Sequence, residues 1–73
     1  MTPQQSRMAR AALGWSLDEF AAQAGVGRVT VARFESGGPL SPDSLLKLEI
    51  ALTNGGAQMI DQAGRVGVTV PKA

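Results

Sequence analysis

Two arginines share one face of a short predicted helix and could donate hydrogen bonds together. A helix turns by about 100° per residue, so Arg28 and Arg33 fall at roughly 0° and 140° around its axis, with Ala32 and Val29 between them. A guanidinium can form paired hydrogen bonds with O6 and N7 of guanine, and small apolar side chains can contact the methyl group of thymine. This face therefore has the chemistry of base readout, and we predict base contacts from Arg28, Val29, Ala32 and Arg33.

The same four residues also have a purely structural interpretation. Exposed helix faces usually carry charged residues, and single exposed valines are normal. Alanine is the strongest helix former. The functional interpretation therefore requires that other elements hold this helix with its apolar side inward, which means Val31 and Phe34 at about 300° and 240°.

The residues before this helix have the pattern of a helix-turn-helix. Ser16 and Glu19 form a capping box, which predicts a helix start. Gly25 permits the left-handed backbone of a sharp turn. Ala21 is small, so it allows the close approach of two helices that cross steeply over a short turn. We predict a helix-turn-helix over residues 17–36.

Start and stop signals outline the other elements. A first helix is predicted from Thr2, which is followed by proline and glutamine at positions that suit a helix start, and a fourth from Ser41 to Asn54. Residues 57–61 and 66–70 alternate in part, which favours a β-hairpin. A two-stranded hairpin is marginal in water, so it must pack on the helices or pair with another chain.

The composition restricts the class of protein. The 73 residues suffice for one domain and include no cysteine and no histidine, so neither disulfides nor the usual metal sites are expected. No nucleophile–base pair or phosphate-binding glycine loop is present in the sequence, and we expect neither an enzyme nor a cofactor. The sequence has no long apolar run and does not open with the charged-then-apolar pattern of a signal peptide, so we expect neither membrane contact nor export.

The stretch Leu17–Ser36, LDEFAAQAGVGRVTVARFES, resembles the helix-turn-helix of the Cro/CI-type, Xre-like repressors. The resemblance extends over about residues 5–55 and is specific, because the order and spacing of several positions agree. The residues that carry it are Ala21, Gly25, Val26, Val31, Phe34 and the ending Glu35-Ser36-Gly37, together with Leu13-Gly14-Trp15-Ser16 and the segment from Pro42-Asp43-Ser44-Leu45 to Ala51-Leu52.

The resemblance implies an all-α fold, a compact bundle of four or five helices that binds operator DNA as a dimer. It also implies an ion pair between Arg10 and Glu35, which would join the first helix to the end of the third. Contacts to the DNA backbone are implied for Arg10 and for Ser16, at the positive end of the second helix. We further predict backbone contacts from Thr30, at the packing boundary of the third helix, and from Ser36.

The chain departs from the family pattern in three places. Leu17 stands where the family commonly has glutamine, and Gly27 stands where it usually has serine or threonine. The third is the tail, which is not part of the repressor core but resembles the tails of short bacterial Xre-like proteins. We therefore divide the chain into a DNA-binding domain, residues 1–55, and a C-terminal hairpin or extended tail, residues 56–73, as a dimerisation element.

These observations predict a sequence-specific regulator of transcription that binds double-stranded DNA through the major groove. We expect a repressor that acts as a homodimer in the bacterial cytoplasm, at the nucleoid. The alternative is a protein-binding module on the same fold, such as an antitoxin or an adaptor. The net charge of only +1 and Leu17 favour this alternative, and the valine-rich tail could add a strand to the sheet of a protein partner.

Overall fold

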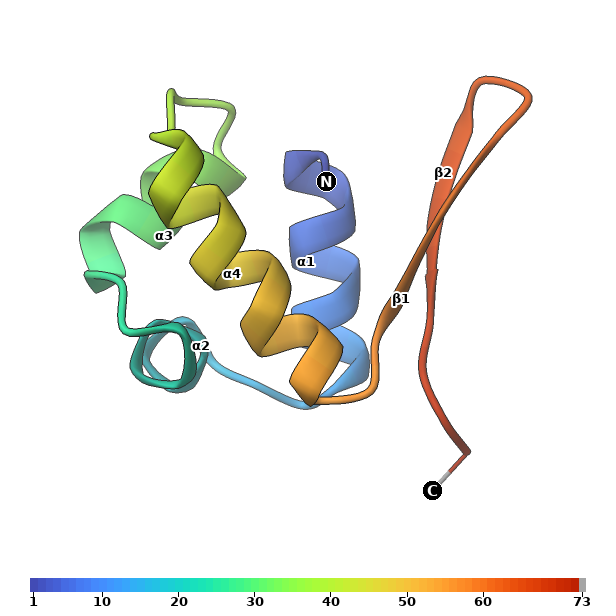
Figure 1. The fold of residues 1–73 in the computed structure, drawn as a ribbon, viewed down its shortest axis with the longest axis horizontal. Helices are drawn as coiled ribbons and strands as arrows, with labels where there is room; N and C mark the ends of the chain where they lie inside the picture. The colour runs from blue at the N-terminus through green and yellow to red at the C-terminus, as the bar shows by residue number, and fades with distance from the viewer. Residues whose placement is uncertain (73) are drawn as a thin grey trace.

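The computed structural model describes residues 1–72, which form four helices followed by a two-stranded antiparallel hairpin (Figure 1). The helices precede the strands along the chain, and no element of one kind is inserted among those of the other. The elements are α1 (Pro3–Ala12), α2 (Leu17–Ala24), α3 (Arg28–Glu35), α4 (Pro42–Asn54), β1 (Gln58–Gln62) and β2 (Arg65–Thr69).

Local sequence explains where the helices begin. The hydroxyl of Thr2 accepts from the amide of Gln5, and that of Ser16 accepts from the amide of Glu19, so both predicted capping boxes are present. The hydroxyl of Ser41 caps α4 through the amide of Ser44. Helix α3 differs because its N-cap, Gly27, has no side chain to donate or accept a hydrogen bond. Its start is therefore determined by packing rather than by a cap.

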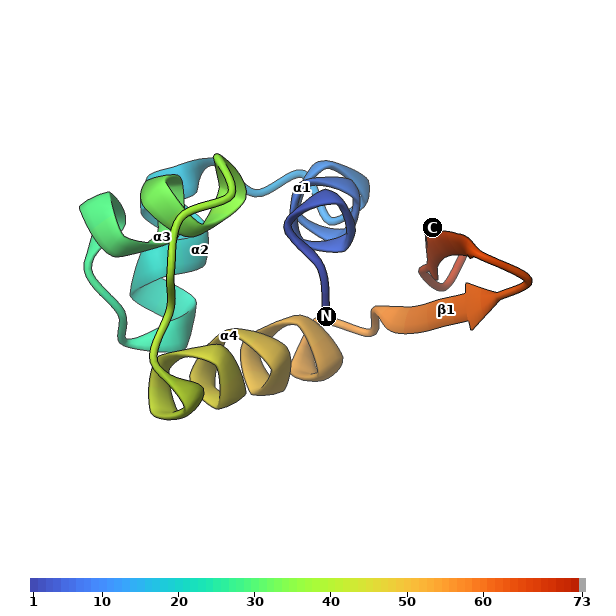
Figure 2. The ribbon, with the colours of Figure 1, turned by 90° about the horizontal axis from the view of Figure 1, so that it is seen from above.

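The core lies where α1, α2 and α3 meet α4, which crosses beneath them in Figure 2. Its fully buried large side chains are Phe20, Leu48, Leu52 and Val31. Small residues on α1, α2 and α4 complete it and let the helices approach closely; these are Ala9, Ala21 and Ala51. The Trp15 ring covers one side of the core, with its centroid 6.0 Å from that of Phe20.

The hairpin turns over two residues, Ala63 and Gly64, between the paired Gln62 and Arg65. Both turn residues have positive φ, 52° and 74°, as a type I′ turn requires. The prediction of a hairpin is therefore confirmed, although its strands are displaced by one residue from the expected 57–61 and 66–70. This turn makes the C-terminal segment a regular sheet rather than an extended tail, so the fold is mostly helical and not all-α.

The hairpin is attached to α1. The Gln5 side chain is buried, and its Nε2 donates to the carbonyls of Ile60 and Gly67 at 3.0 and 3.2 Å. Met59 and Val68 pack against the helical core beside this polar contact. In Figures 1 and 2 the hairpin consequently lies beside α1, at the opposite end of the molecule from α3. The outward face of α3 is not covered by the tail.

None of the helices in residues 1–72 is both long enough and apolar enough to cross a membrane.

Candidate nucleic-acid interface

Helices α2 and α3 are joined by a tight turn at Gly25. This glycine has φ 68°, and its amide donates to the carbonyl of Ala22. The amide of the next residue, Val26, donates to the carbonyl of Ala21, which closes the end of α2. The turn therefore pairs the carbonyls of Ala21 and Ala22 near the end of α2 and directs α3 across α2, as a helix-turn-helix requires.

Helix α3 has one buried side and one exposed side. Val31 is fully buried and Phe34 almost so, as the angular positions predict. Val29, on the opposite side, is 64% exposed, although it is apolar. The side chains that the structure brings together on the outward face are Arg28, Val29, Ala32 and Arg33; Ala32 is half-buried and the others are exposed.

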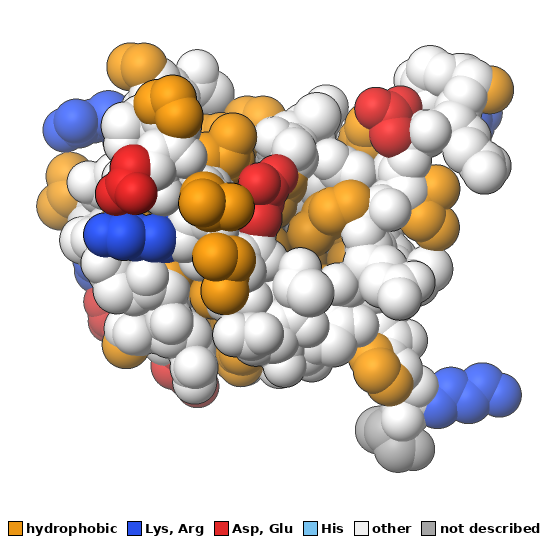
Figure 3. Space-filling model, in the orientation of Figure 1, with side chains coloured by type: hydrophobic (Ala, Val, Ile, Leu, Met, Phe, Trp, Pro, Cys, Tyr) orange, Lys and Arg blue, Asp and Glu red, His pale blue; other side chains and the backbone are white. Residues whose placement is uncertain are grey.

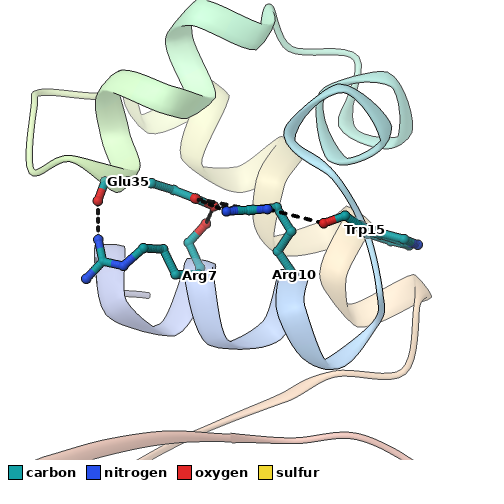
Figure 4. A network of polar contacts seen from close by, with 5 residues as sticks. Arg7, Arg10, Trp15 and Glu35 are labelled. Atoms are coloured by element: carbon teal, nitrogen blue, oxygen red, sulfur yellow. Dashed lines mark hydrogen bonds and ion pairs between the residues drawn. The ribbon is translucent and has the colours of Figure 1, made fainter.

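The inner end of α3 is held by a buried carboxylate. Glu35 is only 5% exposed, and Oε1 lies 2.9 Å from Nη2 of Arg10 on α1 (Figure 4). The Ser6 hydroxyl donates to Oε2 of the same carboxylate at 2.8 Å. Arg7 donates to the backbone carbonyl of Glu35. Three side chains of α1 therefore hold the last residue of α3 against α1.

All three guanidinium nitrogens of Arg10 are already occupied within the chain. Nε and Nη2 donate to Glu35, and Nη1 donates to the carbonyl of Trp15 at 3.2 Å (Figure 4). Because Trp15 directly precedes the N-cap of α2, this one side chain connects α1 with both helices of the helix-turn-helix. The arrangement favours a structural role for Arg10 over a contact with phosphate.

The outer end of α3 carries a second pair of opposite charges. Nε of Arg28 lies 2.8 Å from Oδ1 of Asp18, which is in the first turn of α2. Both side chains are exposed, 57% for Arg28 and 77% for Asp18. An exposed pair of this kind contributes at most about 1 kcal/mol to stability. Its effect is therefore on the position of the Arg28 guanidinium rather than on the fold.

In the comparison with protein families, the helix-turn-helix family model aligns with residues 7–53, from within α1 to near the end of α4. The chain belongs to the Xre/Cro/CI-type helix-turn-helix family. This is a family of DNA-binding regulators of transcription whose partner is double-stranded DNA. Comparison with curated proteins gives no match.

In this helix-turn-helix protein, two carboxylates surround the N-terminus of α2. Oγ of Ser16 accepts from the amide of Glu19 at 3.0 Å, and the amide of Ser16 donates to Oε1 of Glu19 at 3.0 Å. The hydrogen bond from the Ser16 backbone lowers the pKa of Glu19, with a further contribution from the Ser16 hydroxyl. Glu19 is thus ionised at neutral pH and, with Asp18, offsets the positive end of α2 at which a phosphate was expected to bind.

Gly38 is a site residue that the sequence analysis did not identify. A Cβ at this position would lie 2.7 Å from Cγ of Arg33 and 2.9 Å from the carbonyl oxygen of Arg33. The Gly38 amide donates to the same carbonyl at 2.8 Å. The loop after α3 therefore lies directly against the stem of Arg33. Two consecutive glycines could have indicated this contact in the sequence. Gly37, with φ 95°, suffices to end the helix, so the second glycine needs another reason, which is the close approach of Arg33.

The remaining predicted contacts are Thr30, which borders the outward face, and Ser36, which directly follows the last residue of α3. Thr30 is half-buried, and its hydroxyl oxygen lies close to Gly27, 3.8 Å from where a Cβ would stand. Ser36 is exposed and is the C-cap of α3, with its amide bonded to the carbonyls of Ala32 and Arg33. Neither hydroxyl takes part in a hydrogen bond within residues 1–72, and both can therefore reach toward a nucleic-acid backbone.

Proposed function

We propose that the protein is a sequence-specific repressor of transcription that binds duplex DNA as a homodimer, through the major groove and without catalysis. The observation that carries the proposal is the outward face of α3, where two arginines lie with Val29 and Ala32 while Val31 and Phe34 are buried behind them. An α-helix fits the major groove, in which arginine recognises guanine and small apolar groups recognise thymine. The hairpin supports the proposal because it packs on α1 and leaves this face free.

Base contacts are assigned to Arg28, Val29, Ala32 and Arg33. Backbone contacts from Ser16, Thr30 and Ser36 would set the register of the helix on the duplex. A serine hydroxyl has one donor and two acceptor positions, so Ser16 can cap α2 and still donate its hydrogen to a phosphate. We assign Arg10 only to the ion pair with Glu35, which positions α3.

Selection of bound sequences from a random duplex library tests the proposal. The wild-type protein is expected to enrich one motif, and Arg33→Ala is expected to relax discrimination at one base pair by about 1–3 kcal/mol, because it removes a paired hydrogen bond to one base. Lys47→Ala is the matched control, since it removes one positive charge from α4. An Arg33→Ala variant with the wild-type motif would contradict the assignment.

Salt dependence provides an independent test of DNA binding. Contacts with phosphates release counterions, so affinity should fall steeply between about 50 and 200 mM salt. A flat response over this range would remove the electrostatic part of the proposal.

The hairpin is our candidate for the homodimer contact. Each strand has one partner strand in residues 1–72, so its other edge has no strand beside it, and an unpaired edge tends to recruit another strand. A dimer would place two copies of α3 about 34 Å apart, in successive major grooves. Val66→Lys puts a charge beside the edge of β2 and should shift sedimentation toward the monomer. A variant that remains dimeric would contradict this role of the hairpin.

One observation favours a protein-binding module as the second candidate function. Leu46 and Ile50 are about half exposed on α4, and Figure 3 shows hydrophobic side chains gathered on the face that carries this helix. Exposed apolar patches often mark contacts with other proteins. A mobility-shift assay with random duplexes at low salt, run beside a pull-down with the same protein, separates the two functions. The protein-binding function would be favoured if the protein retains no DNA and instead captures a protein partner, and if Leu46→Ser abolishes that capture.

A further inference from the structure

The pair formed by Asp18 and Arg28 joins the two helices of the helix-turn-helix at the edge of the outward face of α3. Among residues 1–72 it is the only ion pair between α2 and α3. It lies at the first residue of α3, where no side-chain cap fixes the helix start. The two charges are not paired in order to offset the cost of burying them, because both side chains are exposed.

The contact constrains how Arg28 can present its hydrogen-bond donors. A guanidinium carries five N–H donors in a rigid planar fork. Asp18 lies at Nε, with Oδ1 at 2.8 Å, so both terminal nitrogens remain available for a base. A side chain held in this way loses less conformational freedom on binding than a free one. Asp18 therefore favours one presentation of Arg28.

The same carboxylate acts against binding wherever Arg28 finds no partner. DNA is a dense polyanion, and a carboxylate at the rim of the interface is repelled by its phosphates. When guanine accepts from Arg28, the hydrogen bonds offset this repulsion. With another base there is no such gain, and the repulsion remains. Building a cost against wrong partners is a general route to specificity.

We propose that Asp18 is a specificity-determining positioning residue, which holds Arg28 for one guanine and weakens binding to every duplex that lacks it. The proposal rests on the proposed DNA-binding function and extends it to a residue of α2 that lies outside the outward face of α3. It requires no contact between Asp18 and the DNA. If it is correct, removing the carboxylate should strengthen binding to random duplex and weaken discrimination at one base pair.

Asp18→Asn is the test, with affinities measured for the selected duplex, for duplexes altered at each base pair and for random duplex. We expect binding to random duplex to strengthen and discrimination at one base pair to fall, each by about three- to tenfold. Asp43→Asn is the matched control, because it removes a carboxylate of similar exposure that is paired with Lys47 on α4. This control should leave discrimination unchanged at every position.

A double variant tests whether Asp18 acts through Arg28. In the Arg28→Ala background, Asp18→Asn should cause no further loss of discrimination, because the side chain that it positions is absent. Additive losses from the two changes would overturn the proposal. So would unchanged discrimination in Asp18→Asn, with affinity raised only as much as in Asp43→Asn, since the carboxylate would then act only as a bulk charge.

Failure of the proposed function is distinguishable from failure of this inference. If the wild-type protein retains no duplex at low salt, the DNA-binding proposal falls and this inference falls with it. If the wild-type protein binds a motif that Asp18→Asn reads with equal discrimination, only the role of Asp18 is overturned. Thermal unfolding of each variant checks that its fold is retained, which is expected because Asp18 is exposed.

Discussion

Helix α3 has an arginine–carboxylate pair near each end, and the two pairs differ in burial and in the number of their partners. At the inner end, Glu35 is 5% exposed and bonds with Arg10 and Ser6 of α1. At the outer end, Arg28 and Asp18 form a single contact and are both largely exposed. We therefore assign different roles to the two pairs, although they consist of similar residue types. Burial makes the first pair part of the fold, whereas exposure leaves the second free to act on a ligand.

Removing one carboxylate at a time gives the largest contrast between the two ends. Glu35→Ala should lower the free energy of unfolding by about 3 kcal/mol, because it leaves the largely buried Arg10 and Ser6 without their partner. Asp18→Ala should change it by less than about 1 kcal/mol, since both members of that pair are in water. Urea denaturation of the two variants measures both values. Equal losses would erase the proposed difference between the ends of α3.

A substitution in the loop after α3 tests how rigidly the inner end is packed. Gly38→Ala should lower the free energy of unfolding by about 2 kcal/mol, because the new Cβ would stand 2.9 Å from the backbone oxygen of Arg33. Gly67→Ala is the matched control, because a Cβ there meets nothing within 4 Å. Denaturation curves should separate the two variants. If Gly38→Ala is as stable as Gly67→Ala, the contact with Arg33 does not constrain the loop.

The smallest effect that we predict is the loss of stability on acidification, which should act through the Glu19 carboxylate that caps α2. The pKa of Glu19 is lowered from its usual 4.5 by the hydrogen bond from the Ser16 backbone. Its stabilising contribution is therefore complete above that value and is lost as pH falls through the lowered pKa of the folded state. Thermal unfolding of wild type and Glu19→Gln should show wild type losing more stability below pH 4.5. Parallel profiles would contradict the capping role of the Glu19 carboxylate.

Features of the fold that depend on local sequence could be predicted from the residues alone. Thr2, Ser16 and Ser41 mark helix starts because a cap involves residues only three positions apart. The buried side of α3 also followed from its sequence, since Val31 and Phe34 share one side of any regular helix. The angular positions likewise identified the outward face.

Contacts between elements could not be predicted in the same way. Whether Asp18 reaches Arg28 depends on the crossing of two helices and on side-chain rotamers, which periodicity does not determine. The hydrogen bonds from Gln5 to the hairpin and from Arg7 to the end of α3 join residues far apart in the chain. The pair of Arg10 and Glu35 was expected only because the family resemblance implied it.

The most direct test of the central claim is to observe which amides change when the protein binds DNA. The selected duplex is titrated into isotope-labelled protein, and chemical-shift changes are mapped onto the sequence. We expect the largest changes in α3 from Arg28 to Arg33, followed by the start of α2 at Ser16. Changes confined to α4 around Leu46 and Ile50, with α3 unaffected, would contradict it.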